Sequence, residues 1–455
     1  MKKSDLTKGP VFKTLLLFSL PLVATNVVQL LFHAADVAVL GIMVDDGAVA
    51  AVGACGPIVN LLVSLFAGLA SGSNVLIARL VGSRDTSGAR RATGTSLFLG
   101  LLSGVILTVV GIVGAEQFLV WMQCQPDVLK EATLYLRIYF SGMPVIMLYN
   151  FVSAILRAVG DSTRPMVYMF IAGGLNVALN FFFIGACGME VAGVALATVL
   201  SNLVSLVLAL VALFKNDGFC KVEMQNLRIR KWELIQISKV GVPSAICGLF
   251  FYVANLFVSA GVNSLSTDAM TANAASGQFD AIIYNVGMSI AIACMAMVGQ
   301  GIGAKNVARV KKTVLVSIGY ATVASLALGG LFVLMAEPLL GIITDSDAVI
   351  AIAKEKMVVL CLTYFVTSIM EVCSFSLRAM GYNGCTFVVG VLCGFFIRSA
   401  WVWFAWEPLG KGLGTLYYAY PVSAGVAVLI YTVYYAFFAF KGVRKRLMEE
   451  TKLCG

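Results

Sequence analysis

The chain has 455 residues, of which 60% are hydrophobic and only 12% are charged. Together with a mean hydropathy of +0.93, this composition excludes an ordinary soluble domain and predicts an all-α integral membrane protein with many spans. The net charge of +9 does not indicate nucleic-acid binding, because the basic residues are sorted into alternate loops.

Six apolar stretches fill the first half of the chain. Each is about 20 residues long, the length that a helix needs to cross roughly 30 Å of hydrocarbon. We place these spans near residues 14–41, 50–78, 93–119, 132–156, 165–186 and 191–214. The odd-numbered loops are short, so the helices that they join are predicted to be antiparallel neighbours.

The first span carries a polar stripe on an otherwise apolar helix. Asp36 is preceded by His33, Gln29 and Asn26 at intervals of 3, 4 and 3 residues, which keeps all four on one face. Charge within hydrocarbon is costly, so Asp36 is predicted to bind a coupling ion, and the alternative is a hydrogen-bonded structural carboxylate. We assign Asn26, Gln29 and His33 to a substrate pathway. His33 either shares a proton with Asp36 or is a polar spacer in a wet cavity.

The fifth and sixth spans add three polar side chains at a similar depth. Asn176 and Asn180 lie one turn apart on a common face, and Thr198 lies in the next span. Beside the Asp36 carboxylate, their amide and hydroxyl oxygens could ligate a small hard cation such as Na⁺. The alternative is that they form only hydrogen bonds between helices.

A polar segment at 215–235 divides the chain nearly in half. Its LRIRKWELIQISK portion is predicted to be either a short amphipathic helix at the headgroup level or a basic connector. A second set of spans follows near 236–262, 273–300, 313–335, 350–377, 384–406 and 413–440. The predicted domains are a six-helix bundle at 1–214, a cytoplasmic linker at 215–235, a second six-helix bundle at 236–441 and a basic cytoplasmic tail at 442–455.

Among the ionisable groups of the second half, we single out Asp280, near the outer end of its predicted span, Glu371 and Arg398. We assign all three to the substrate pathway. At about 1.5 Å per residue, Glu371 lies roughly 10 Å deep and Arg398 roughly 20 Å, so they pair only if the arginine reaches down. Structural anchoring is the alternative for this couple.

The two halves repeat each other at a constant distance. GSRDTSGARRA begins at Gly82 and its echo GAKNVARVKKT begins at Gly303, while LRAVG ends at Gly160 and LRAMG ends at Gly381. The differences 303 − 82 and 381 − 160 are both 221. Because each copy has an even number of spans, the two bundles are predicted to be parallel repeats, related by a pseudo-twofold axis along the membrane normal. The positive-inside rule then places both termini in the cytoplasm.

Motifs of several other functional classes are absent from the sequence. There is no G-x-x-x-x-G-K-[ST], H-E-x-x-H or G-x-S-x-G, so neither ATP hydrolysis nor another enzymatic activity is predicted. Eleven cysteines are scattered without C-x-x-C spacing, which indicates neither a disulfide framework nor a metal centre. We expect a monomeric transporter without a cofactor, whose partners are membrane lipids and a small-molecule drug or metabolite.

Several motifs together resemble the multidrug and toxic compound extrusion (MATE) family, nearly from end to end. They are SLPLVATNVVQLLFHAADVAVLG, LRAVGDSTRP, NVALN followed by VAGVALATVLSN, VGQGIGA and LRAMGYNG. The resemblance implies two six-helix bundles that alternate between outward-open and inward-open forms. It also implies export of organic cations or other amphipathic compounds in exchange for H⁺ or Na⁺, with Asp36, Asn176, Asn180 and Thr198 at the coupling site.

Two positions depart from the family pattern. Asn180 stands where sodium-binding relatives often have an aspartate, and His33 stands where asparagine is common, so the choice between H⁺ and Na⁺ stays open. The resemblance also implies a multi-pass protein of the bacterial plasma membrane. The alternative function is a flippase for a lipid-linked saccharide or cell-wall precursor, which would favour more cations in the cleft than Arg398.

Overall fold

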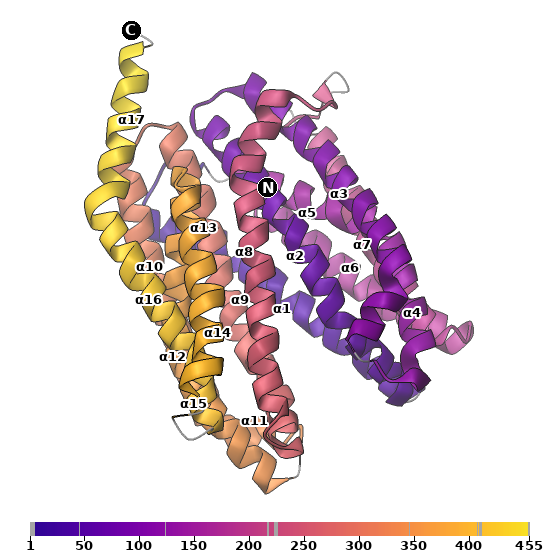
Figure 1. Ribbon diagram of the computed structural model, residues 1–455. Coiled ribbons are helices and arrows are strands. Elements are labelled where there is room, and N and C mark those ends of the chain that lie inside the picture. Colours follow the sequence, from indigo (N-terminus) through magenta and orange to yellow (C-terminus); the bar gives the residue numbers. More distant parts are fainter. Residues whose placement is uncertain are drawn as a thin grey trace. The chain divides into compact units, whose positions relative to one another are not determined.

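The computed structural model describes residues 5–44, 46–122, 124–215, 218–222, 226–344, 346–406, 408 and 412–453. Every regular element within these ranges is a helix (Figure 1). Among the described residues, 11 helices are long and apolar enough to cross a membrane, and one bent pair makes a twelfth span if it is counted as one. The prediction of an all-α membrane protein is therefore confirmed, and each predicted stretch falls on one of these segments.

The chain folds as two compact units. Unit 1 contains Ala24–Ala245, and unit 2 contains Leu6–Val23 and the described residues from Ile246 onward. Consequently α1 (Val11–Met43) gives its first part to unit 2 and the rest to unit 1, whereas α8 (Lys231–Asn263) begins in unit 1 and ends in unit 2. The predicted domain boundaries at 214, 235 and 441 stay predictions.

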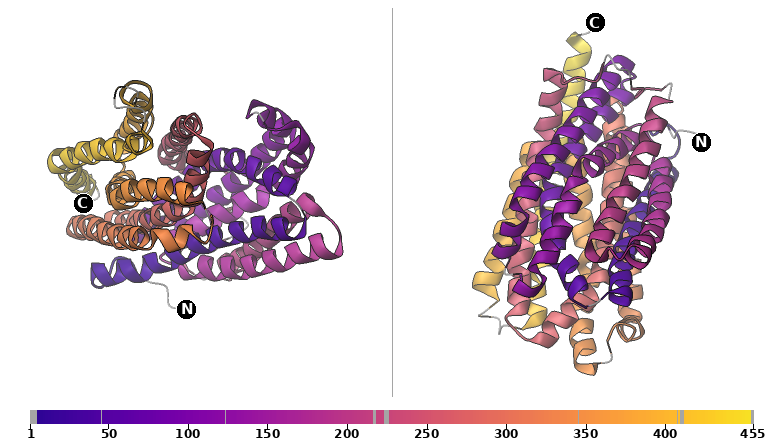
Figure 2. Two further views of the ribbon diagram at one scale, coloured as in Figure 1. Left: turned by 90° about the horizontal axis from the view of Figure 1, so that it is seen from below. Right: turned by 90° about the vertical axis from the view of Figure 1, so that its right-hand side faces the viewer.

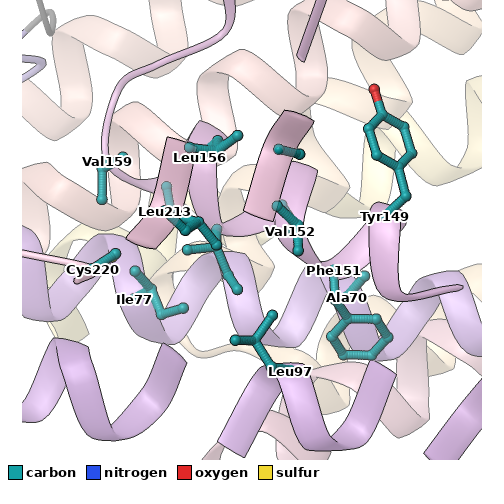
Figure 3. Packing of buried hydrophobic residues seen from close by; sticks show 14 of the residues in the cluster. Ala70, Ile77, Leu97, Tyr149, Phe151, Val152, Leu156, Val159, Leu213 and Cys220 are labelled. Carbon is teal, nitrogen blue, oxygen red and sulfur yellow. The ribbon is translucent and has the colours of Figure 1, made fainter. Parts of the chain in front are cut away.

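Unit 1 has a buried core between helices that are far apart in the sequence. Figure 3 shows Ile77, Leu97, Leu156 and Leu213, from four different helices, in one apolar cluster. Such packing removes the apolar side chains of several helices from their surroundings at once and fixes how these helices lie against one another. The remaining elements of unit 1 are α2 (Asp46–Gly82), α3 (Thr86–Trp121), α4 (Pro126–Ser141), α5 (Met143–Ala158), α6 (Thr163–Asn180), the π-helical turn η1 (Phe181–Ala186) and α7 (Glu190–Phe214).

A bend of 50° separates α4 from α5. Pro144 has no N–H to donate to the carbonyl of Phe140, so the helix cannot continue through this point undisturbed. Thr108 Oγ1 of α3 instead donates to the Phe140 oxygen at 2.8 Å, which pairs this carbonyl inside the bundle. The span predicted at 132–156 is thus a bent pair of helices. The presence of a proline did not predict this bend, because a proline in a span does not always break the helix. Pro21 and Pro243 lie inside unbroken helices.

Unit 2 is built around small residues where three of its long helices cross. The side chain of Ser368 on α12 lies against Gly287 of α9, and its Oγ is 2.7 Å from Oγ of Ser325 on α10. Small side chains let helix backbones approach closely in a membrane, and hydroxyl groups then bond across the contact. The helices involved are α9 (Thr267–Gly303), α10 (Val307–Leu334) and α12 (Asp347–Met380).

Unit 2 ends in a continuous helical segment formed by α16, η5 and α17, drawn in yellow in Figures 1 and 2. Besides the three long helices, this unit contains short helical segments and two helices interrupted by π-helical turns. They are α11 (Ala336–Leu340), α13 (Asn383–Val391), η3 (Leu392–Ile397), α14 (Arg398–Ala400), η4 (Trp401–Ala405), α15 (Leu413–Tyr417), α16 (Ala419–Tyr434), η5 (Tyr435–Ala439) and α17 (Phe440–Leu453).

The two units repeat the same backbone turns at the distance found in the sequence. Arg84 and Lys305 are the non-glycine residues with positive φ among those described, at 60° and 56°, and they are 221 residues apart (305 − 84). The next residues, Asp85 and Asn306, cap α3 and α10 by accepting hydrogen bonds from Gly88 N at 2.8 Å and Arg309 N at 2.9 Å. The duplication in the sequence is therefore a duplication of local structure.

Candidate functional site

Unit 1 brings the four predicted ion-site residues together. Asn180 Nδ2 donates to Asp36 Oδ1 at 2.5 Å and lies 3.5 Å from Asn176 Oδ1. Asn176 Nδ2 in turn donates to Thr198 Oγ1 at 3.3 Å, and the Thr198 hydroxyl donates to the carbonyl of Val194 at 3.0 Å. The cluster therefore connects α1, α6 and α7 through a chain of side-chain hydrogen bonds that ends at a single carboxylate.

Asp36 is only 8% exposed, and it lines a cavity of 480 Å³ in unit 1. Gln29 and His33 of the same helix face also line this cavity, whereas Asn26, one turn earlier, does not. The α1 stripe thus lines the cavity over its last two turns, as a helix with one polar face does when it borders a wet space within a membrane.

Other residues of the cavity wall were not identified from the sequence. Tyr135 and Tyr139 of α4 stack with ring centroids 5.9 Å apart and an angle of 19° between the rings, and both line the cavity. Asn150 of α5 and Asn202 of α7 add amide groups. The spacing of four between the tyrosines was visible, but aromatic residues at this spacing also fill ordinary helix contacts.

In unit 2, Asp280 is buried against a lysine that sequence reasoning did not single out. Lys356 Nζ lies 2.8 Å from Asp280 Oδ2 and donates to the carbonyl of Asn273 at 3.2 Å. The Cys361 thiol lies 3.7 Å from Asp280 Oδ1, and the lysine nitrogen is 5.4 Å from the ring centroid of Tyr417. Both charges of this pair are therefore matched within the unit.

Arg398 and Glu371 do not meet in the described part of unit 2. Arg398 donates to Asn255 Oδ1 at 2.8 Å and to Ser423 Oγ at 3.5 Å. Its guanidinium carbon is 4.5 Å from the ring centroid of Tyr420 and 4.9 Å from that of Phe251. The arginine is thus held by amide, hydroxyl and aromatic groups, and its contacts do not extend to the carboxylate of Glu371.

A family model described as MatE matches residues 21–182 and 243–403, one segment in each half of the chain. The chain is 26% identical over 455 residues to the probable multidrug resistance protein YoeA of Bacillus subtilis, covering 97% of each protein. It is 30% identical over 313 residues to the probable multidrug resistance protein YpnP of the same organism, covering 68% of this chain and 69% of that protein.

Solved structures share the fold along the whole chain. One is the outward-facing conformation of a multidrug resistance MATE family transporter, with a TM-score of 0.88 and 23% identity over 99% of this chain and 100% of the other. Another is a MOP superfamily transporter from Pyrococcus furiosus described by the reverse polarity of its binding pocket, with a TM-score of 0.89 and 23% identity over 98% and 99% of the two chains. With a family model that matches most of its length, the chain belongs to the MatE family, the multidrug and toxic compound extrusion proteins.

Proposed function

We propose that the protein is a secondary active exporter that moves organic cations or other amphipathic compounds in exchange for H⁺ or Na⁺. The observation that carries this proposal is the carboxylate of Asp36, buried within a membrane-length helix at the wall of a cavity. An ionised carboxylate in such a place is unfavourable unless a proton, a cation or hydrogen-bond donors compensate its charge. Binding of a small cation to Asp36 therefore provides a way to couple transport to an ion gradient.

The polar groups around Asp36 support a monovalent occupant. The cluster of Asp36, Asn176, Asn180 and Thr198 contains one carboxylate, so one proton or one Na⁺ neutralises it. In the structure Asn180 donates an N–H to Asp36, which stabilises the ionised carboxylate. Asn180 Oδ1 is buried and finds no hydrogen-bond partner among the described residues. Binding of Na⁺ would require this amide to turn and present that oxygen to the ion.

The same cavity supports binding of a flat, positively charged compound. Its volume of 480 Å³ lies within the range of about 300–1,000 Å³ that is typical of small-molecule sites. The faces of Tyr135 and Tyr139 attract cations, and Asp36 supplies the opposite charge. A transporter with the same fold is described by the reverse polarity of its binding pocket, so the fold alone does not determine the charge of the compound. We therefore infer the preference for cations from the residues of this chain.

Coupling follows if the ion and the compound compete for the charge of Asp36. A cation gains affinity when the carboxylate is ionised, and it loses that affinity when a proton or Na⁺ is bound. For transport, the ion must also bind the outward-open and inward-open forms with different affinities. Equal affinity for both forms would leave the equilibrium between them unchanged. Downhill ion entry would then release the compound on the outside.

We further propose that both termini lie in the cytoplasm of a bacterium and that the protein acts as a monomer in the plasma membrane. Basic residues before the first span, in the even-numbered loops and in the tail support this orientation. The flippase alternative is not favoured, because the curated relatives are named as multidrug resistance or multidrug export proteins.

Transport by purified protein in liposomes tests the proposal, with a proton gradient and a sodium gradient imposed separately. Wild type is expected to move a fluorescent organic cation under at least one gradient, and Asp36→Asn is expected to lose this gradient-driven flux. Glu116→Gln is the matched control, because its carboxylate is exposed, at 64%. Full gradient-dependent flux in Asp36→Asn would refute the role of this residue.

A further inference from the structure

A basic pocket lies on the surface of unit 1, where the connector after α7 meets α3 and the start of α8. It has a volume of 540 Å³. Its charged lining consists of Arg91 from α3, Arg228 and Arg230 from the connector, and Lys231 and Glu233 from α8. Four cations and one carboxylate give a net charge of +3 (4 − 1). The connector residues 227–230 are not helical, and α8 begins at Lys231, so LRIRKWELIQISK is the end of a connector and the start of a long helix.

The single carboxylate of this pocket is already paired. Glu233 is 4% exposed, and its Oε1 lies 3.0 Å from Nε of Arg91. Arg228 and Lys231 are exposed, and Arg230 donates from its terminal nitrogen to Asn226 Oδ1 at 3.3 Å. Within the pocket, therefore, three cations converge beside a carboxylate whose charge is matched by another residue.

The connector is fixed against α3 by its backbone. Thr95 Oγ1 donates to the carbonyl of Arg228 at 3.3 Å, and the backbone N–H of Arg230 donates to Thr95 Oγ1 at 3.4 Å. Gly94 permits this close approach, since a Cβ at that position would collide with the carbonyl of Asn226. The positions of the two arginines are thus set by the fold of unit 1.

The pocket lies beside the first turns of α3 and α8, where we expect lipid headgroups. α3 and α8 are both membrane-length helices, and Lys231 is the first residue of α8. Arg91 lies five residues after Thr86, the start of α3, a rise of about 7.5 Å at 1.5 Å per residue. Trp232 is 54% exposed beside these charges, and Ile229 is 41% exposed. Tryptophan favours the boundary between headgroups and hydrocarbon.

We propose that this pocket binds the phosphodiester headgroup of an anionic membrane lipid such as phosphatidylglycerol. Guanidinium groups donate to phosphate oxygens in a fixed planar geometry, which Arg228 and Arg230 supply, and Lys231 adds a third charge. Trp232 and Ile229 provide apolar surface for the beginning of the acyl chains. A free phosphate offers the same oxygens but would make no use of that apolar surface, which is why we assign the pocket to a lipid.

Lipid binding to the full-length protein in detergent, followed by native mass spectrometry, tests this assignment. The titrants are phosphatidylglycerol, phosphatidylcholine with the same acyl chains, and sodium phosphate. The double variant Arg228→Ala/Arg230→Ala removes two cations of the pocket. Its matched control, Lys13→Ala/Lys312→Ala, removes two exposed cations elsewhere.

Wild type is expected to bind phosphatidylglycerol at least about tenfold more tightly than phosphatidylcholine. Loss of two cations from the pocket should weaken phosphatidylglycerol binding about twenty-five-fold, at about fivefold per charge, whereas the control pair should change it by less than about twofold. Unchanged phosphatidylglycerol affinity in the double variant would overturn the proposal. So would displacement of the lipid by an equal concentration of sodium phosphate, because free phosphate would then be the ligand.

Two further variants keep the test decisive if the double variant aggregates. Arg228→Lys/Arg230→Lys preserves the charge but not the planar donor geometry, and should bind phosphatidylglycerol less tightly than wild type but more tightly than the double alanine variant. Trp232→Ala leaves every cation in place and should weaken phosphatidylglycerol binding about fivefold without affecting phosphate binding. Equal lipid affinity in Trp232→Ala and wild type would contradict the contact with the acyl chains.

Discussion

The two units share a scaffold but differ in their buried charges. Asp36 stands in the first helix of unit 1, and the residues 221 and 222 positions later are Phe257 and Val258 of α8. The offset of 221 is that of the repeated motifs. The offset of 222 is the distance between Pro21 of α1 and Pro243 of α8 (243 − 21). The carboxylate at the centre of the unit 1 cluster therefore has an apolar counterpart in unit 2.

Unit 2 instead carries charges at other places, and two of them, Asp280 and Arg398, have partners within the unit. Asp280 pairs with Lys356, and Arg398 contacts an amide and two aromatic rings. By contrast, the turns at Arg84 and Lys305 and their helix caps agree in both units. Both units have therefore kept the turns and helix caps that the backbone requires, while their buried polar groups differ. We therefore expect the unit 1 charge to serve coupling and the unit 2 ion pair to serve stability.

Breaking the Asp280–Lys356 ion pair of unit 2 should cost more stability than changes to the glycines, turns or helix caps of either unit. Lys356→Met leaves the Asp280 carboxylate buried without its partner and should lower the free energy of unfolding by about 3–5 kcal/mol, whereas Asp280→Leu/Lys356→Met should recover most of this loss. The control is Lys354→Met, because the ion pair of Lys354 with Glu337 is exposed and its loss should change stability far less. Thermal unfolding in detergent measures all three. Equal stability of Lys356→Met and wild type would show that the pair is not structural.

Two pairs of neighbouring glycines, one pair in each unit, differ in how closely other atoms approach them. A Cβ at Gly329 of α10 would collide with the backbone carbonyl of Cys361, whereas one at Gly330 meets nothing within 4 Å. Gly329→Ala should therefore cost about 1–3 kcal/mol, and Gly330→Ala should cost no stability. In unit 1, Gly173 faces the Phe32 ring, which can move, while Gly174 is open. Gly173→Ala should consequently destabilise less than Gly329→Ala. Equal unfolding temperatures for Gly329→Ala and Gly330→Ala would contradict the close contact.

The repeated turns should respond alike to one substitution. Arg84 and Lys305 both have positive φ, a conformation that costs a side chain about 1–2 kcal/mol, part of which glycine gives back as backbone entropy. Arg84→Gly and Lys305→Gly should each raise the free energy of unfolding by about 0.5 kcal/mol. If the turns are equivalent, denaturation experiments should show the same change in the free energy of unfolding for both variants. Changes of opposite sign would show that the turns are not equivalent.

The smallest effect distinguishes the helix caps at low pH. The backbone N–H of Gly88, followed by the Ser87 hydroxyl, lowers the pKa of Asp85 below its ordinary value of 3.8. The cap therefore adds stability that is fully present well above pH 3.8 and is lost as the pH falls through the lowered pKa of the folded state. Asn306, the counterpart in unit 2, does not titrate. Asp85→Asn should thus remove a small acid-dependent loss of stability, and an identical acid profile in wild type and Asp85→Asn would count against this cap.

Hydropathy predicted the spans well because a membrane requires long apolar helices, and the constant offset of 221 predicted two copies of one bundle. The bend before α5 was not predicted. Proline lowers the stability of a helix interior at every position, and whether the helix breaks depends on tertiary partners such as Thr108.

The proximity of Asp36, Asn176, Asn180 and Thr198 was predicted better than the rest of the cavity wall, whereas their role in ion binding stays a prediction. The spacing on α1 and α6 fixes which side chains share a helix face, so the convergence on Asp36 followed once the helices were adjacent. The stacked Tyr135 and Tyr139 were missed, because aromatic side chains are ordinary in any span. The partner of Asp280 was also missed, because contacts between helices are not encoded in the periodicity of one helix.

The most direct test of the central claim is the affinity of purified protein for an organic cation, measured as a function of pH and of Na⁺ concentration. If one ion competes with the compound at Asp36, wild-type affinity should fall up to about tenfold for each tenfold rise in the coupling ion, and Asp36→Asn should show no such dependence. The same ion dependence in Asp36→Asn as in wild type would contradict the account.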